Sequence, residues 1–167
     1  MSYEINIVSI NQKKEVQLPF TSEIILRNEV TNPEVSRYAD IWPFFSQTTG
    51  ILYTLVKEVN EEFYSSFSLC DSDFDSIISK KLPPGWILNH NEDNLTPLII
   101  RAEVYDDFIK IVEFLLVSSP NRTIMFQSRY QGGDDEIIVG VIKFKKFISM
   151  LDKKEILFNV CYIIEGD

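Results

Sequence analysis

The sequence predicts a mixed α+β protein whose strands form a mixed or antiparallel sheet. Residues 95–167 alternate apolar and helical runs in the order strand, helix, strand, strand, helix, strand, which is the ferredoxin-like βαββαβ order. Residues 1–94 open with two β-rich runs followed by helical patterns. The 167 residues are 45% hydrophobic, which is enough apolar surface for one substantial core. We therefore expect a single compact domain, residues 1–167, with an N-terminal strand-plus-helix half (1–94) and a C-terminal ferredoxin-like half (95–167).

Two strands and a short helix should open the N-terminal half. Tyr3–Ile10 alternates apolar and polar residues, and Glu23–Val30 is a second run of strand-forming residues. Asn32 is typical of an N-cap, and a proline and an acidic residue follow it in the first turn. This pattern predicts a helix through Tyr38, which Pro43 must end or kink.

A longer amphipathic helix is expected over residues 51–67, and a shorter one after it. Asp71 and Ser72 are candidate caps for the second helix, Asp73–Lys81, which a Pro-Pro-Gly sequence stops. The polar segment Asn89–Asn94 then marks the boundary between the halves. The apolar residues that recur at three- and four-residue steps in the first helix are Ile51, Leu52, Leu55, Val56, Val59, Phe63 and Phe67.

The C-terminal half should consist of four strands and two helices. Gln131–Asp134 has the composition of a hairpin connection between the second and third strands. Val141–Lys143 either ends the third strand or begins the helix after it, because so short an apolar run does not distinguish the two. The expected elements are a strand at Leu98–Val104, a helix at Asp106–Val117, strands at Thr123–Tyr130 and Glu136–Ile142, a helix through Phe144 and Leu151, and a strand at Ile156–Ile164.

The charge and the cysteines bear on partners and compartment. Sixteen basic and twenty-five acidic residues give a formal charge of -9, which repels nucleic acid and favours a cationic protein partner, or simply keeps the protein in solution. Cys70 and Cys161 form no metal-binding or disulfide pattern, so we expect reduced, buried thiols. The first ten residues do not read as a signal peptide and no apolar stretch is long enough to span a membrane, so we expect a cytoplasmic protein without membrane contact.

The common catalytic motifs are missing from the sequence. The one histidine, His90, lies in a polar loop, and there is no GxSxG, Walker, GxGxxG or HExxH motif. The strand expected at Glu136–Ile142 lacks the aromatic and basic residues of an RNA-recognition module. We therefore expect a non-enzymatic protein that needs no cofactor.

One acidic segment has the spacing that begins a calcium-binding loop. Asp71, Asp73 and Asp75 alternate as in an EF-hand, but Ser76 replaces the glycine at the sixth position and Leu82 replaces the glutamate at the twelfth. A capped helix start with solvated aspartates explains these residues better. No metal site is predicted.

Three acidic groups and one tyrosine are the candidate partner-binding residues. Each group alone is typical of solvated surface, but groups gathered on one side would speed encounter with a basic partner. Tyr130, next to the expected hairpin, is the aromatic residue most suited to a surface anchor. The acidic groups are Glu58, Glu61 and Glu62; Asp71, Asp73 and Asp75; and Asp134, Asp135 and Glu136.

A second candidate surface is the sheet face opposite the helices. Alternation would place Arg101, Glu103, Gln127, Arg129 and Asn159 on that face. It is then either a ligand floor or a hydrogen-bonded network covered by the N-terminal half.

In outline the chain resembles the immunity proteins of bacterial polymorphic and contact-dependent growth inhibition toxin systems. The resemblance rests on size, acidity and the run from Leu98-Ile99-Ile100-Arg101 through Gln131-Gly132-Gly133-Asp134-Asp135-Glu136 to Phe158-Asn159-Val160-Cys161-Tyr162. It implies a small α+β protein that binds a cognate toxin domain, often a nuclease with a basic cleft, and blocks it by occlusion.

Two other functions stay open. A small-molecule-binding regulatory module would use the polar sheet face, with Arg101, Gln127 and Arg129 lining a pocket, or the cleft between the halves. An enzyme would have to work through carboxylates or through Cys161. The sequence does not fix the oligomeric state.

Overall fold

The computed structural model describes residues 3–31, 43–60, 63–73, 86–87, 96–130 and 137–167. Its strands are β1 (Tyr3–Ile10), β2 (Ile24–Val30), β3 (Gly50–Asn60), β4 (Phe63–Ser65), β5 (Trp86–Ile87), β6 (Thr123–Tyr130), β7 (Ile137–Lys143) and β8 (Val160–Glu165). Its helices are α1 (Pro43–Gln47), α2 (Ala102–Ser118), α3 (Phe144–Asp152) and the 3-10 turns η1 (Ser66–Leu69) and η3 (Pro120–Arg122). Helices and a mixed sheet together confirm the α+β class.

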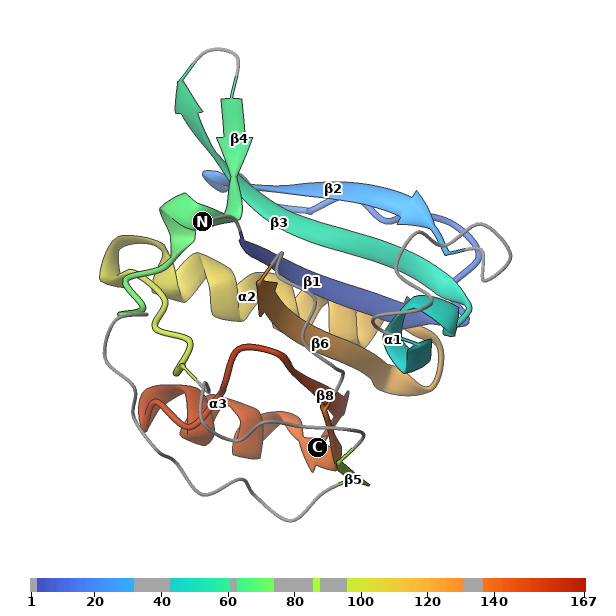
Figure 1. Ribbon diagram of the computed structural model, residues 1–167. Coiled ribbons are helices and arrows are strands. Elements are labelled where there is room, and N and C mark those ends of the chain that lie inside the picture. The colour runs from blue at the N-terminus through green and yellow to red at the C-terminus, as the bar shows by residue number, and fades with distance from the viewer. Residues whose placement is uncertain (1–2, 32–42, 61–62, 74–85, 88–95, 131–136) are drawn as a thin grey trace.

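The strands form one sheet in the order β2-β3-β1-β6-β8-β7-β5, with β4 paired to the end of β3. Every neighbouring pair is antiparallel except β7 and β8, which are parallel and are joined through α3. The first strand lies between β3 and β6, so residues from the N-terminal and C-terminal halves of the chain meet in the middle of the sheet (Figure 1).

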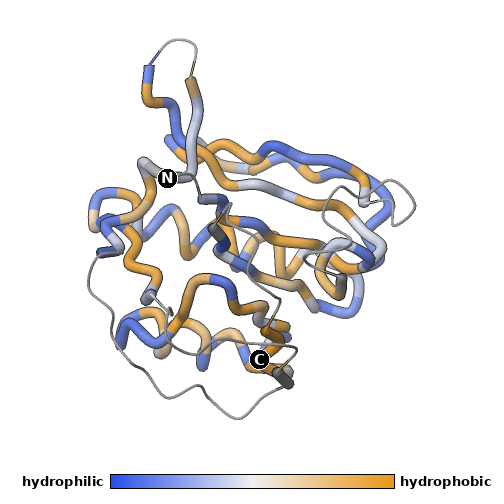
Figure 2. The backbone as a smooth tube through the Cα atoms, in the orientation of Figure 1, coloured by the Kyte–Doolittle hydropathy of each residue, from blue (hydrophilic) through white to orange (hydrophobic). Residues whose placement is uncertain are grey.

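Helices α2 and α3 cover one face of the sheet, and the main core lies beneath them (Figure 1). The ring of Phe126 on β6 makes edge-on contacts with Phe108 of α2 at 6.0 Å and with Phe147 of α3 at 5.0 Å between ring centroids. Alternate residues of β1 and β3 point toward the same helices, as the two-residue period of a strand requires. Figure 2 shows this as hydrophobic segments in the centre of the molecule and hydrophilic segments at its margins.

The opposite face carries a smaller apolar cluster. Val8, Met125, Ile138 and Cys161 come from four different strands, and Phe45 of the short helix α1 packs on them. Helix α1 therefore covers part of the face that α2 and α3 leave open.

The helix expected over residues 51–67 is wrong. Residues 50–60 form β3, and after two residues outside the described part the chain returns as β4 and η1. Ile51, Tyr53 and Leu55 alternate toward the core, and the run is rich in β-branched and aromatic residues, which favour a strand. Non-local pairing with β1 and β2 overrides the helical spacing of the apolar residues.

The strand expected at Leu98–Val104 is also wrong, because α2 already begins at Ala102. The residues before it make only isolated bridges, from Ile100 to Cys70 and from Pro97 to Leu157. In the sheet β8 lies between β6 and β7, so β6 and β7 do not pair with each other as the expected hairpin would. The structure therefore does not confirm the ferredoxin-like arrangement.

Most other elements agree with the sequence. The strands at Tyr3–Ile10 and Thr123–Tyr130 are confirmed with those bounds, and β2, α2, β7, α3 and β8 lie where a strand or helix was expected. Val141–Lys143 ends β7 rather than beginning the helix. The helix from Pro33 to Tyr38, most of the helix at Asp73–Lys81, the loop with His90 and the Gln131–Asp134 connection lie outside the described residues.

Candidate functional site

The β3–β4 hairpin projects from one end of the sheet. Figure 1 shows β4 and the last residues of β3 standing clear of the other strands. Lys57 pairs with Ser65, Glu58 with Tyr64 and Asn60 with Phe63, and the register shifts between Glu58 and Asn60. Such a bulge bends the strand and re-aims the side chains beside it. The hairpin is therefore a separate, outward-facing element.

Two apolar side chains on this hairpin face solvent. Val59 is 54% exposed and Phe63 is 55% exposed, and the exposed Glu58 lies between the end of the sheet and Val59. A single exposed apolar residue is ordinary, but an exposed phenylalanine costs free energy that burial against a partner would recover. The hairpin thus combines an aromatic anchor with negative charge.

The base of the hairpin is fixed to the sheet by polar contacts. Lys57 Nζ lies 3.0 Å from Glu23 Oε2, and the guanidinium of Arg27 lies 5.3 Å from the centroid of the Tyr64 ring. A cation over an aromatic face at this distance is attractive. These contacts tie both strands of the hairpin to the region of β2 and orient the element without using Val59 or Phe63.

A serine joins the two central strands below the hairpin. The hydroxyl of Ser66 accepts a hydrogen bond from the N–H of Ile5 at 3.2 Å and donates one to the carbonyl of Leu55 at 2.6 Å. Ile5 and Leu55 are opposite each other in the β1–β3 register, so the hydroxyl stands in the ladder between them. The segment after β4 is therefore held against the sheet end.

The acidic residues that follow η1 lie at the same end of the sheet. Tyr3 begins β1, and its register partner on β6 is Tyr130. The buried Cys70 forms a side-chain hydrogen bond with Tyr3, which places the residues after η1 beside the start of β1. Asp71 follows Cys70 directly, is exposed, and has Oδ1 3.1 Å from Arg101 Nε. Part of its charge is therefore balanced by Arg101.

The structure places four of the ten predicted partner-binding residues. Glu58, Asp71 and Asp73 are exposed, and the backbone of Tyr130 ends β6 at the same end of the sheet. The six others, Glu61, Glu62, Asp75, Asp134, Asp135 and Glu136, lie outside the described residues. Val59 and Phe63 were not among the predicted residues, because a helix over 51–67 would have buried both. Alternation at Ile51, Tyr53 and Leu55 was the signal for a strand there.

The sheet face opposite α2 and α3 carries a polar network on β1, β3 and β6. Arg129 Nη2 lies 2.7 Å and its Nε 3.1 Å from Glu4 Oε2, with the arginine side chain only 5% exposed. Asn6 donates to Glu4 at 3.4 Å and accepts from Thr54 at 2.7 Å. Much of the expected polar face is thus a network within the protein.

Two other residues expected on that face lie elsewhere, and one on it lacks a partner. Arg101 precedes α2 and Glu103 is in its first turn, so neither belongs to the face. Gln127, opposite Asn6 in the β1–β6 register, is fully buried, and its amide nitrogen and oxygen have no hydrogen-bond partner among the described residues. Asn159 is buried just before β8, and its N–H donates to the carbonyl of Ser128 at 2.7 Å.

Both cysteines are free and buried. Burial raises the pKa of the Cys70 thiol to about 12, so it carries no thiolate near neutral pH. Among the described residues no group of three histidine, cysteine or carboxylate side chains is placed to hold a metal ion. Of the helices in the described ranges, none has the length and apolar character needed to cross a membrane.

Comparison with known proteins identifies no relative of this chain. No protein-family model, curated protein or solved structure matches the chain. Its function must therefore be inferred from the geometry and charge of the chain itself.

Proposed function

We propose that this protein is a non-catalytic, cytoplasmic inhibitor that binds and neutralises a basic bacterial toxin domain, in the manner of an immunity protein. The observation that carries the proposal is the projecting β3–β4 hairpin, with exposed Phe63 and Val59 beside an exposed acidic residue. An element of this shape suits insertion into a concave site such as the basic cleft of a nuclease. The inhibitor then works by occlusion and needs no bond-making residue of its own.

The hairpin divides affinity and association rate between two kinds of residue. Phe63 is the anchor, because aromatic side chains buried at the centre of an interface carry most of its binding energy. Glu58 and Asp71 lie toward the rim, where charges mainly steer the encounter. The net charge of -9 extends that steering to the whole molecule.

The experiment compares Phe63→Ser with a matched control on another surface. Val117 on α2 is 54% exposed, nearly the same as Phe63. The next residue, Ser118, accepts a hydrogen bond from Gln12, just beyond the end of β1 that lies away from the hairpin. The partner to test is the product of the neighbouring reading frame, which the proposal expects to carry a toxin domain, and binding is measured by titration calorimetry. We expect Phe63→Ser to weaken binding at least ~30-fold, the loss of a hot-spot residue, and Val117→Ser to change it by less than about twofold.

Salt dependence tests the steering. The association rate with the same partner should fall as salt rises from about 0.05 to 0.5 M, and Glu58→Gln should lower it without changing the dissociation rate. Equal effects of Phe63→Ser and Val117→Ser, or no protection of cells from the adjacent toxin, would remove the proposal.

A second function is favoured by one specific observation, the buried amide of Gln127. Buried polar groups in native proteins have partners, and this amide has none among the described residues. A small polar molecule enclosed beside Gln127 would satisfy it, as in a ligand-binding regulatory module. A screen for metabolites that raise the melting temperature tests this. Gln127→Leu should abolish that shift, and the absence of any stabilising metabolite would leave a structural water as the partner.

A further inference from the structure

Strand β2 is the outermost strand on one side of the sheet. It pairs with β3 and with no other strand in the described part of the chain, and its last four residues are exposed. Thr31 N–H donates to the carbonyl of Gly50 at 3.0 Å, and hydrogen-bonded pairs alternate along an antiparallel ladder. Thr31, directly after β2, therefore bonds to β3, as does every second residue before it. The residues between them, Leu26, Asn28 and Val30, have backbone groups that point away from β3. An open row of this kind is a template for another strand.

The two faces of this edge differ. Arg27 and Glu29 share the face opposite α2 and α3, because they pair with Thr54 and Leu52 of β3, whereas Leu26 and Asn28 pair with the core residues Leu55 and Tyr53. Neither Arg27 nor Glu29 has an ion-pair partner among the described residues. Figure 2 shows the middle of β2 as hydrophilic.

From these features we propose that β2 pairs antiparallel with β2 of a second copy of this chain, about a two-fold axis at Asn28. Because inward- and outward-facing backbone groups alternate along β2, a second copy can pair only with outward-facing residues opposite outward-facing residues. In the register centred on Asn28, Arg27 of each copy lies opposite Glu29 of the other, so this contact occurs twice. Moving the centre toward Arg27 sets two arginines opposite each other, and moving it toward Glu29 sets two glutamates opposite each other. Charge therefore favours the register centred on Asn28 over its two neighbours.

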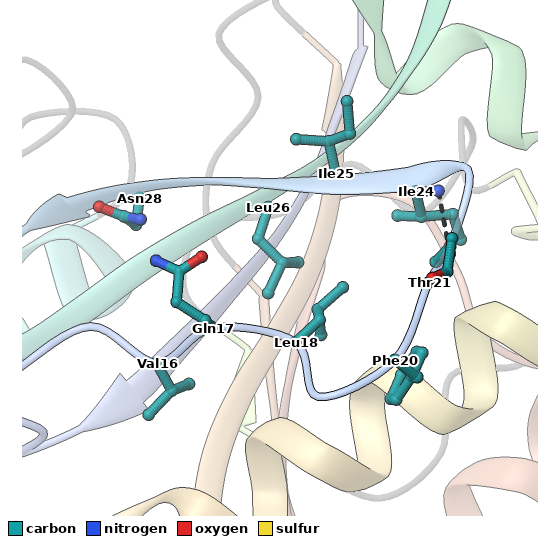
Figure 3. Close-up of a pocket in the computed structure, with 10 residues that line it drawn as sticks. Val16, Gln17, Leu18, Phe20, Thr21, Ile24, Ile25, Leu26 and Asn28 are labelled. Carbon is teal, nitrogen blue, oxygen red and sulfur yellow. Dashed lines mark hydrogen bonds between the residues drawn. The ribbon is translucent and has the colours of Figure 1, made fainter.

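The same register covers exposed apolar surface on the core side. Val30, which is 72% exposed, falls opposite Leu26 of the second copy. Below Leu26 and Asn28 lies a pocket of about 280 Å³, walled on its other side by Val16, Gln17 and Leu18 (Figure 3). Figure 3 shows Leu26 pointing into this space and Ile25 pointing away from it. The pocket gives the valine of the second copy a place to bury.

The segment that walls the pocket leaves the edge itself free. Phe20 contacts the ring of Phe114 on α2, and Ser22 donates a hydrogen bond to Asp107 on the same helix. The segment is therefore held beside α2, on the helix side of the sheet, and not in the plane where a further strand would add. About six backbone hydrogen bonds would form between the β2 strands of the two copies, two for each pair of outward-facing residues.

Charge reversal with rescue tests the proposal by sedimentation equilibrium from roughly 1 µM to 1 mM, a range that detects weak dimers. We expect the wild type to approach twice 19.4 kDa at the upper concentrations. Arg27→Glu and Glu29→Arg alone should each weaken self-association at least ~10-fold, because each makes two like-charge contacts. An equimolar mixture of the two variants should recover it, since every cross-pair is then opposite in charge.

A backbone variant separates pairing from side-chain effects. Asn28→Pro removes an N–H that points away from β3, so far-UV circular dichroism should be unchanged while self-association is lost. Concentration-dependent slowing of hydrogen exchange at Leu26, Asn28 and Val30 should accompany the dimer. A wild type of 19.4 kDa throughout the range, or a dimer that neither charge variant weakens, would overturn the proposal.

Discussion

Arg129 and Glu4 face each other across β6 and β1, with Arg129 Nη2 2.7 Å from Glu4 Oε2. The arginine side chain is almost fully buried and the glutamate is partly exposed. Removing one member of such a pair leaves the other charge without compensation in a poorly solvated place.

Arg129→Met should therefore lower the free energy of unfolding by about 2 kcal/mol, below the cost for a fully buried pair because water still reaches Glu4. Urea denaturation measures the loss. The double variant Arg129→Met with Glu4→Gln should lose less than the two single losses added together. Strict additivity would show that the pair is not coupled.

Ser66→Ala should destabilise the junction between β1 and β3. The substitution leaves the N–H of Ile5 and the carbonyl of Leu55 without the hydroxyl that links them. A buried group that loses its partner costs about 1–3 kcal/mol. Ser66→Thr keeps the hydroxyl and serves as the control in urea denaturation, and an alanine variant as stable as the threonine variant would contradict the role of the link.

Gly50→Ala should be strongly destabilising. Gly50 has a φ of 153°, and a Cβ there would lie 2.1 Å from the backbone oxygen of Ser9. Backbone must move to relieve a contact that short, so we expect a loss of at least about 2 kcal/mol in the free energy of unfolding. Gly140→Ala on β7 is the matched control, because a Cβ there meets nothing within 4 Å. Similar melting temperatures for the two variants would contradict the close approach of the two backbones where β3 begins.

Stability should fall at alkaline pH through Cys70. Burial raises its pKa from 9.0 to about 12, so between these values the folded protein keeps a proton that the unfolded chain loses. The contribution is complete below pH 9 and is lost as the pH rises toward 12, with a slope approaching ~1.4 kcal/mol per pH unit for one proton. Desolvation raises the pKa of the buried Tyr162 as well, which adds in the same direction above pH 10.

Cys70→Ala isolates that effect. Its unfolding free energy should decline less steeply than that of the wild type between pH 9 and 10, before tyrosines of the unfolded chain titrate. In the wild type at neutral pH both thiols should resist iodoacetamide until the protein is unfolded. Parallel pH profiles, or rapid alkylation of the native protein, would contradict the burial of Cys70.

Local patterns predicted the elements whose signals are strong along the chain itself. Alternation indicated β1, and the three- and four-residue spacing of Phe108, Val112 and Leu115 marked α2. The apolar residues of 51–60 fit both the two-residue period of a strand and the three- and four-residue spacing of a helix. Only pairing with β1 and β2 decides that they form a strand. Insertion of β8 between β6 and β7 is likewise a matter of long-range pairing, which local spacing does not contain.

The candidate site likewise contains residues that the sequence predicts and residues that only the structure reveals. Charge alone was enough to single out Glu58 and Asp71, because exposed carboxylates are a property of composition and position. Phe63 and Val59 needed the hairpin, since an apolar residue is assigned to the core until its element is known to project. The edge of β2 needed the whole strand order, which shows that no other strand of the described residues covers it.

The central place of β1 has a consequence for synthesis. Its partner β6 begins more than a hundred positions later, so a ribosome adding ~5–20 residues per second needs several seconds or more between the two. During that interval the nascent N-terminal segment holds Ile5 and Ile7 without the helices that later shelter them. Pairings this distant also slow refolding of the finished chain. We expect a protein that folds late, and that depends on chaperones during translation more than its modest length would suggest.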